Sequence, residues 1–313
     1  MYPGVFMVSI RKSFSFSALF LLFFAFMAVL PVFGRGAEES DINPGMITLR
    51  DFYDREISLD SPAQTIVSLS PGITETVFAL GYGDRLLGRT SYCDYPAEAA
   101  SVPSVGSLME PDIEAIVALN PDLVIASTHF PEEALDKLES AGQKVAVFMG
   151  QDSFEGVYDG VIRPVARVLG DPGAGEDLVA SMKETVEKAL AVVEGFTETP
   201  SVYYVVGFGE GGDWTAGGDT FISEMIEMAG GRNIAADVSG WSFSLEAIVD
   251  GDPDLILLPR WAEPVFSTTP VYSDLRAVEE GHAIAIDENT IVRQGPRLAE
   301  GFAALVAAVG SVL

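Results

Sequence analysis

The sequence predicts an α/β fold with two similar α/β lobes, which a long connecting helix joins and a ligand cleft separates. Short β-branched runs alternate with helical patterns, as is typical of α/β layers. One helix-turn-strand segment occurs twice, once in each half of the chain. A stretch with helical spacing lies between the two halves. The predicted strands are 65–69, 123–126, 144–148, 202–206, 255–258 and 283–286.

The repeated segment is the strongest sign of two related lobes. It runs from Ile113 to Ala126 as IEAIVALNPDLVIA and from Leu245 to Leu258 as LEAIVDGDPDLILL. Each copy predicts a short helix, a turn with an Asn/Asp-Pro-Asp sequence and a strand. A weaker match pairs 74–81 with 223–230, two helical patterns that each end in a glycine. We therefore expect two lobes of similar fold.

Helical apolar spacing continues between the lobes, over 154–169 and 174–196. Glu184 and Lys188 are placed for an i,i+4 ion pair on its outer face. A helical connection resists the wide bending that flexible linkers permit, so we expect limited lobe motion. The predicted division is an N-terminal lobe at 46–152, a helical connector at 153–197 and a C-terminal lobe at 198–313.

The amino terminus carries the pattern of a secretory signal at 1–37. Arg11 and Lys12 precede an apolar stretch from Phe14 to Phe33, which ends in small residues. Its apolar core over 18–30 has the length of a signal peptide, while the longer flanked stretch leaves a retained membrane anchor open. We expect the rest of the chain in the periplasm or at the outer face of the cytoplasmic membrane.

Charge and cysteine content exclude several functions. The formal net charge is −28, and such an acidic surface repels nucleic-acid backbones. The single cysteine, Cys93, has no partner for an internal disulfide, and we expect it to be a packing residue. With two histidines and one cysteine, the chain is poorly supplied for a protein-only zinc site. We expect no intrinsic cofactor.

Several ordered motifs together resemble a known family. They are IVSLSPGITE at 66–75, SYCDYP at 91–96, the EAIVALNPDLVI segment, WTAG at 214–217, AGGRNI at 229–234 and GPR at 295–297. Over nearly the whole exported part, the chain resembles the cobalamin and ferric-siderophore branch of ABC-transporter substrate-binding proteins, which have a rigid helical backbone. The resemblance implies capture of a corrinoid, cobalamin or cobinamide, and its delivery to an ABC permease dimer with ATPase subunits. A ferric siderophore or haem is the alternative ligand. We expect a monomer when the protein is free.

The resemblance also implies a role for Glu114 and Glu246, which occupy matched positions of the repeat. They resemble the acids, one on each lobe, that such proteins offer to arginines of the permease, and carboxylate–guanidinium contacts are charge-assisted and often bidentate. Alternatively, both glutamates simply lie in the first turn of a helix, where the helix dipole favours negative charge, and Asp112 and Ser244 cap these helices. The two interpretations are compatible. Glu75 and Glu224 are also matched, and we expect both at ordinary exposed helix positions.

Aromatic residues in loops after strands are candidates for the cleft wall, because a corrin-sized ligand needs broad apolar faces. The resemblance implies that four of them match the aromatic wall of the cobalamin-binding members. Leu108 and Ser127, however, occupy positions where those members present tryptophans, which leaves the ligand open. The aromatic candidates are Tyr92, Tyr95, Phe208, Trp214 and Trp241, and all but Tyr95 carry the match.

Arginines and a histidine complete the candidate site. Arg260 follows a strand, and Arg293 and Arg297 bracket a turn. With Arg89 they would favour a ligand with carboxylates or catecholates, unless they pair with local acids. His129 follows the 123–126 strand in a loop that we expect to open on the cleft. Its imidazole is either a ligand for a bound cobalt or iron or a solvated loop side chain.

An exported α/β enzyme is the competing class, since carboxylates for acid and base catalysis are plentiful. The sequence, however, contains no nucleophile elbow, phosphate loop, dinucleotide fingerprint or metal-ligand helix. The abundant acids are more simply a solvated surface. A ligand sensor that uses the same fold is a third class. We therefore expect a binding protein rather than an enzyme.

Overall fold

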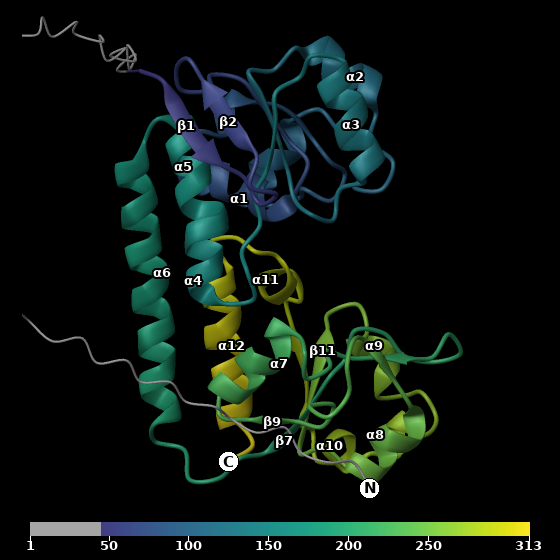
Figure 1. The fold of residues 1–313 in the computed structure, drawn as a ribbon. Helices are drawn as coiled ribbons and strands as arrows, with labels where there is room; N and C mark the ends of the chain where they lie inside the picture. Colours follow the sequence, from purple (N-terminus) through teal and green to yellow (C-terminus); the bar gives the residue numbers. More distant parts are fainter. Residues whose placement is uncertain (1–44) are drawn as a thin grey trace, which may run out of the picture. The chain divides into compact units, whose positions relative to one another are not determined.

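The computed structural model describes residues 45–313. The predicted signal segment at 1–37 lies outside the described residues. Two four-stranded parallel sheets form the centres of two lobes, which confirms the predicted α/β fold (Figure 1). No helix among the described residues is both long and apolar enough to cross a membrane.

The N-terminal sheet has the order β4-β3-β5-β6, and all its neighbours are parallel. A β1–β2 hairpin precedes it, and α1, α2 and α3 connect or follow its strands. The bounds are β1 Ile47–Arg50, β2 Glu56–Leu59, β3 Ile66–Ser68, α1 Pro71–Ala79, β4 Leu86–Arg89, α2 Ile113–Leu119, β5 Leu123–Ala126, α3 Glu132–Ser140 and β6 Val145–Val147.

The C-terminal sheet repeats this arrangement with the order β12-β11-β7-β9, again parallel throughout. A two-stranded antiparallel ribbon, β8–β10, lies beside it in the same lobe. The bounds are β7 Ser201–Tyr204, β8 Asp213–Trp214, α7 Phe221–Met228, β9 Arg232–Asn233, β10 Ser242–Phe243, α8 Leu245–Gly251, β11 Leu255–Pro259, α9 Glu263–Phe266, α10 Arg276–Glu279, β12 Ala283–Ile286, α11 Asn289–Val292 and α12 Leu298–Gly310.

The repeated segment folds in the same way in both lobes, as α2–β5 and as α8–β11. The Asp that opens each strand makes equivalent bonds: Asp122 Oδ2 accepts from the Thr65 backbone amide at 2.9 Å, and Asp254 Oδ2 accepts from that of Ser201 at 2.7 Å. In return, the hydroxyls of Thr65 and Ser201 accept from the amides of these two aspartates. The repeat therefore fixes the neighbouring strand in each lobe.

Helices join the lobes over the two stretches where the sequence has helical apolar spacing. The first runs through α4 (Phe154–Val157), a π-helical turn at Tyr158–Ile162 and α5 (Arg163–Leu169), and it ends at Gly170 with a φ of 82°. The second is α6 (Pro172–Val193), where Asp171 caps the Ala174 amide and the predicted Glu184–Lys188 pair forms at 2.7 Å. At 1.5 Å per residue, α6 extends about 33 Å. It packs against α5 and α12 (Figure 1).

The apolar core continues from one lobe into the other. Phe154 lies edge-on against Phe221 of α7 and Phe302 of α12, with ring centroids 5.4 Å apart in both pairs. Gly72 at the start of α1 lies so close to the C-terminal lobe that a Cβ atom there would be 2.3 Å from the Gln294 carbonyl oxygen. Shared packing of this kind agrees with limited lobe motion.

Candidate functional site

A cleft of about 660 Å³ lies between the lobes, lined from both sides. The N-terminal lobe contributes the segments that follow β3, β5 and β6, where the carboxyl ends of three parallel strands meet. Such ends are the usual binding edge of α/β sheets. The C-terminal lobe contributes the start of α7, the segment before β10 and the region around α11.

The N-terminal wall is mainly apolar, with one imidazole and, at Asp152, one carboxylate. Tyr92 and Met109 are 57% and 67% exposed, and they line the cleft together with Met149 and His129. His129 follows β5, as the sequence predicts, and its side chain is exposed. Leu108 and Ser127 also line the cleft, at the two positions where the resemblance implies tryptophans in cobalamin-binding members.

The C-terminal wall carries Trp241, which lines the cleft and is 44% exposed. Its carbonyl accepts a hydrogen bond from the Thr215 amide at 2.8 Å, which ties it to the β8–β10 ribbon. Asp219 Oδ1 accepts from the Gly240 amide at 2.7 Å, just before Trp241. The loop that presents this indole is therefore held at two points.

Phe208 and Trp214 lie outside the residues that line the cleft. Trp214 pairs with Ser242 in the β8–β10 ribbon and is 46% exposed. Phe208 is half-buried and lies parallel to Trp261, with ring centroids 6.0 Å apart. Sequence analysis missed Trp261, although it comes shortly after β11 and so at the same edge of the sheet as Phe208.

Asp213 and Tyr272 form a hydrogen-bonded pair, and Tyr272 packs against Phe208. The Tyr272 hydroxyl donates to Asp213 Oδ1 at 2.6 Å and accepts from the Gly209 amide at 3.1 Å. Burial and the bond to Asp213 raise the pKa of Tyr272 to about 12. Burial likewise raises the pKa of Asp213, and the Tyr272 bond only partly offsets this. Because Phe208 packs edge-on against Tyr272, the pair anchors the loop that carries it.

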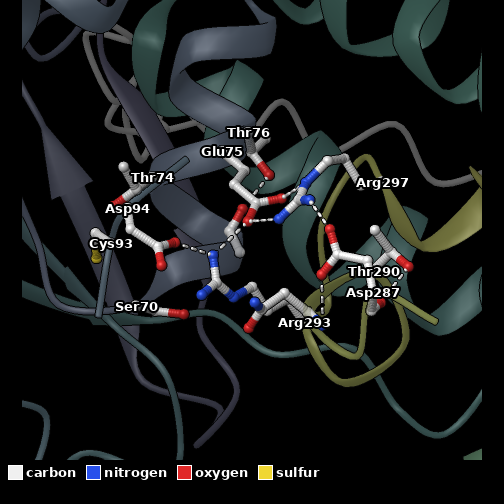
Figure 2. A network of polar contacts seen from close by, with 12 residues as sticks. Ser70, Thr74, Glu75, Thr76, Cys93, Asp94, Asp287, Thr290, Arg293 and Arg297 are labelled. Atoms are coloured by element: carbon white, nitrogen blue, oxygen red, sulfur yellow. Dashed lines mark hydrogen bonds and ion pairs between the residues drawn. The ribbon is translucent and has the colours of Figure 1, made fainter. Parts of the chain in front are cut away.

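Arg297 and Tyr95 belong to a buried ion network between the lobes and not to the cleft wall (Figure 2). Arg297 donates from Nε and Nη2 to the two carboxylate oxygens of Glu75, at 2.9 and 2.7 Å. Tyr95 covers the guanidinium, whose carbon lies 3.8 Å from the ring centroid. Glu75 is 3% exposed, so the expectation that it is an ordinary exposed helix residue is wrong.

Arg293 lines the cleft and also belongs to this network. Its Nη1 donates to Glu75 Oε1 at 2.9 Å and to Asp94 Oδ1 at 2.7 Å (Figure 2). Partial burial alone would raise the pKa of the Asp94 carboxyl, but the bond and charge of Arg293 outweigh it and hold that pKa below its usual range. Two arginines that sequence analysis considered for the ligand are thus paired with local acids.

The remaining arginines lie away from the cleft lining. Arg260 is exposed, and its backbone amide is 3.4 Å from Glu288 Oε2. Arg89 donates to the carbonyls of Ala99 and Thr90. Cys93 is buried against the Thr90 hydroxyl, and burial raises the pKa of its thiol, which confirms it as a packing residue.

The two matched acids are exposed in the first turns of their helices. Glu114 lies in α2, where Asp112 accepts from the Ala115 amide at 2.9 Å. Glu246 lies in α8, where Ser244 accepts from the Ala247 amide at 3.1 Å. The predicted caps are confirmed. The caps bond to helix amides in place of the glutamates. Neither glutamate carboxylate forms a hydrogen bond or ion pair with another described residue.

This architecture, with two parallel-sheet lobes, a helical backbone and a cleft at strand ends, is that of a two-lobed solute-binding protein. The model of the periplasmic binding protein family matches residues 66–290, and the chain belongs to that family. It is a family of solute-binding proteins and not of enzymes.

Three similar proteins show what the chain resembles, and the names of two of them give a ligand. A cobalamin-binding protein of Halobacterium salinarum is 33% identical over 271 residues, covering 82% of this chain and 72% of that protein. An uncharacterized ABC transporter substrate-binding lipoprotein of Bacillus subtilis is 31% identical, covering 85% and 86%. The structure of a periplasmic heme-binding protein from Roseiflexus sp. RS-1 matches with a TM-score of 0.73 at 30% identity, covering 80% and 99%.

Proposed function

We propose that the protein captures a corrinoid, cobalamin or cobinamide, in the cleft and delivers it to an ABC permease. The observation that carries the proposal is a cleft of about 660 Å³ to which each lobe presents an aromatic ring, Tyr92 from one and Trp241 from the other. This volume lies within the usual range for small-molecule sites. The similarity to the Halobacterium cobalamin-binding protein supports the same ligand class.

The lining suits a flat metal chelate. Aromatic rings and the flexible side chains of Met109 and Met149 give apolar surfaces that adapt to the faces of a macrocycle. His129 offers an imidazole, which is a good ligand for cobalt or iron. The ligand would supply its own metal, and the protein would supply the axial nitrogen and the apolar walls.

Handover would use Glu114 and Glu246. Both carboxylates are exposed, each comes from the same position of the repeated segment, and each lobe presents one. Two related patches can engage the two copies of a permease dimer, whose guanidiniums would bind the carboxylates. In this proposal the protein is a monomer when free, and ATPase subunits drive release through the permease.

Haem is the second candidate ligand. The likeness to the Roseiflexus heme-binding structure and the position of His129 in the cleft favour it. A ferric siderophore is less well supported, because Arg293 is the only arginine among the described residues that line the cleft and it is already paired with two acids.

The test is a titration of the purified full-length chain with cobalamin, dicyanocobinamide, haemin and a ferric catecholate siderophore. Visible absorption reports the chelate, and quenching of tryptophan fluorescence, compared between wild type and Trp241→Phe, reports the approach of a chromophore to Trp241. We expect a corrinoid to bind at micromolar concentration or below. If haemin binds more tightly than either corrinoid, haem is the ligand class and the corrinoid proposal is wrong. If no chelate binds, the proposed function is wrong.

A further inference from the structure

Acidic side chains outnumber basic ones among the charged groups that line the cleft. Asp152, Asp219 and Arg293 are the charged side chains among its described lining residues, and His129 and Tyr92 also line it. No lysine lines it within residues 45–313. A ligand that enters the cleft therefore meets two carboxylates and a single guanidinium.

The charge of that guanidinium is already compensated. Arg293 Nη1 lies between Asp94 Oδ1 at 2.7 Å and Glu75 Oε1 at 2.9 Å, and the side chain is only 10% exposed. Glu75 also holds Arg297, which in turn lies 3.5 Å from Asp287. Three carboxylates thus surround two guanidiniums, which leaves an excess of one negative charge beside the cleft (Figure 2).

The two acids of the lining differ in their surroundings. The Asp219 carboxylate accepts hydrogen bonds from the Gly240 amide and the Ser239 hydroxyl, and these bonds lower the pKa of Asp219. Asp152 is exposed just before the connector. A carboxylate of a ligand would therefore approach like charges, and the guanidinium of Arg293 would attract it little, because the charges of Asp94 and Glu75 already offset its own.

We propose that these charges make the cleft a filter against ligands that carry carboxylates, so that it selects corrinoids over iron porphyrins. The periphery of a corrin ring ends in neutral amides and its metal carries positive charge, whereas haem carries two propionates. The proposal rests on the function proposed above, capture of a tetrapyrrole chelate. Asp94 is the residue that determines this specificity, because its charge offsets that of Arg293, the one guanidinium among the described lining residues that would attract a propionate.

The experiment compares haemin with its dimethyl ester, two iron porphyrins that differ only in the charge of the propionates. Affinities for the full-length chain are measured by fluorescence quenching in 50 mM and 500 mM NaCl, with dicyanocobinamide as the reference corrinoid. We expect the ester to bind about tenfold more tightly than haemin at low salt, which corresponds to about 1.4 kcal/mol. High salt should reduce this preference, because it screens exposed charges.

Two variants locate the filter. Asp94→Asn keeps a hydrogen-bond acceptor for Arg293 but removes the charge, and Asp152→Asn removes a lining charge. Each should reduce the preference for the ester at least threefold, and the double variant should reduce it further. Asp177→Asn, an exposed acid on α6 away from the cleft, is the matched control and should leave the preference unchanged.

The outcomes separate the two proposals. If corrinoids bind but haemin binds as tightly as its ester, the filter is wrong while the corrinoid function stands. The filter is also wrong if the preference is the same in Asp94→Asn as in Asp177→Asn. If neither corrinoids nor porphyrins bind, the proposed function fails and the filter fails with it.

Discussion

Arg297 of the C-terminal lobe and Glu75 of the N-terminal lobe form a bidentate ion pair, with N–O distances of 2.9 and 2.7 Å. Glu75 is 3% exposed and Arg297 is 9% exposed, so water screens the pair little. Removing one partner of such a pair leaves an uncompensated buried charge. The pair therefore links the two lobes through a contact that neither lobe can satisfy alone.

The first prediction concerns this link. Glu75→Gln should lower the free energy of unfolding by about 3 kcal/mol, because two buried guanidiniums lose their shared carboxylate. Urea unfolding followed by far-UV circular dichroism measures the change. Glu224→Gln, at the matched but exposed position in α7, is the control and should change stability by no more than about 0.5 kcal/mol. Equal losses in both variants would contradict a special role for Glu75.

The second prediction concerns docking. The double variant Glu114→Arg/Glu246→Arg should keep its ligand affinity and lose transport, because reversed charges repel the arginines expected on the permease. Uptake of labelled ligand into proteoliposomes with the permease measures transport. Glu187→Arg, an exposed reversal on α6, controls for net charge. To separate docking from the helix dipole, Glu114→Gln should cost at most about 1 kcal/mol of stability. Unchanged uptake by the double variant would rule out the docking role.

The third prediction separates the aromatic candidates. Trp241→Ala should weaken ligand binding about 10- to 100-fold, since a buried aromatic face contributes about 1.5–3 kcal/mol. Trp214→Ala is a matched control, because the two indoles are 44% and 46% exposed and only Trp241 lines the cleft. Isothermal titration measures both affinities. If Trp214→Ala costs as much as Trp241→Ala, the ligand extends beyond the cleft as the structure defines it.

The fourth prediction concerns His129. If its imidazole binds the metal of the ligand, His129→Ala should shift the visible absorption bands of the bound chelate, because the axial nitrogen is lost. Added imidazole should restore the original bands. His282→Ala, which removes the other histidine, should leave the spectrum unchanged. Identical spectra for wild type and His129→Ala would show that His129 is a solvated loop side chain and not a ligand of the metal.

The fold could be predicted from sequence because its signals are local. The strands at 123–126 and 283–286 are buried or half-buried β-branched runs, and the structure has them at the same residues. The caps Asp112 and Ser244 also depend only on neighbouring residues. Such signals need no knowledge of the tertiary contacts.

The ion network could not be predicted in this way, because Glu75 and Arg297 are 222 residues apart in the chain. Glu75 occurs in a helical pattern whose sequence does not reveal that a second lobe covers it. Contact between the lobes also explains why the prediction of Tyr95 as a cleft residue was incorrect: its ring lies on Arg297 and not in the cleft. Trp261, in contrast, could have been predicted from the sequence. It is an aromatic residue shortly after a strand, which is the same signal that identified Phe208.

The last prediction concerns acid stability and the repeated segment. Asp254 accepts hydrogen bonds from the Ser201 amide and hydroxyl and from Arg276 Nη2 at 2.8 Å. Partial burial raises the pKa of Asp254, but these bonds and the charge of Arg276 outweigh it and lower the pKa to about 2. Because the folded pKa is below the ordinary value of 3.8, the stability that the carboxylate contributes is present above about pH 4 and is lost as the pH falls towards 2.

Asp254→Asn should therefore be less stable than wild type at pH 6, and the difference should shrink between pH 4 and pH 2. Its size is about 1 kcal/mol, since the side chain is 39% exposed and solvent screens part of the effect. Urea unfolding at pH 6, 4 and 2.5 measures the difference, and Asp177→Asn is the control without such bonds. A gap between wild type and Asp254→Asn that stays constant over this range would mean that the carboxylate's charge contributes nothing, and that Asp254 joins β7 to β11 through its hydrogen bonds alone.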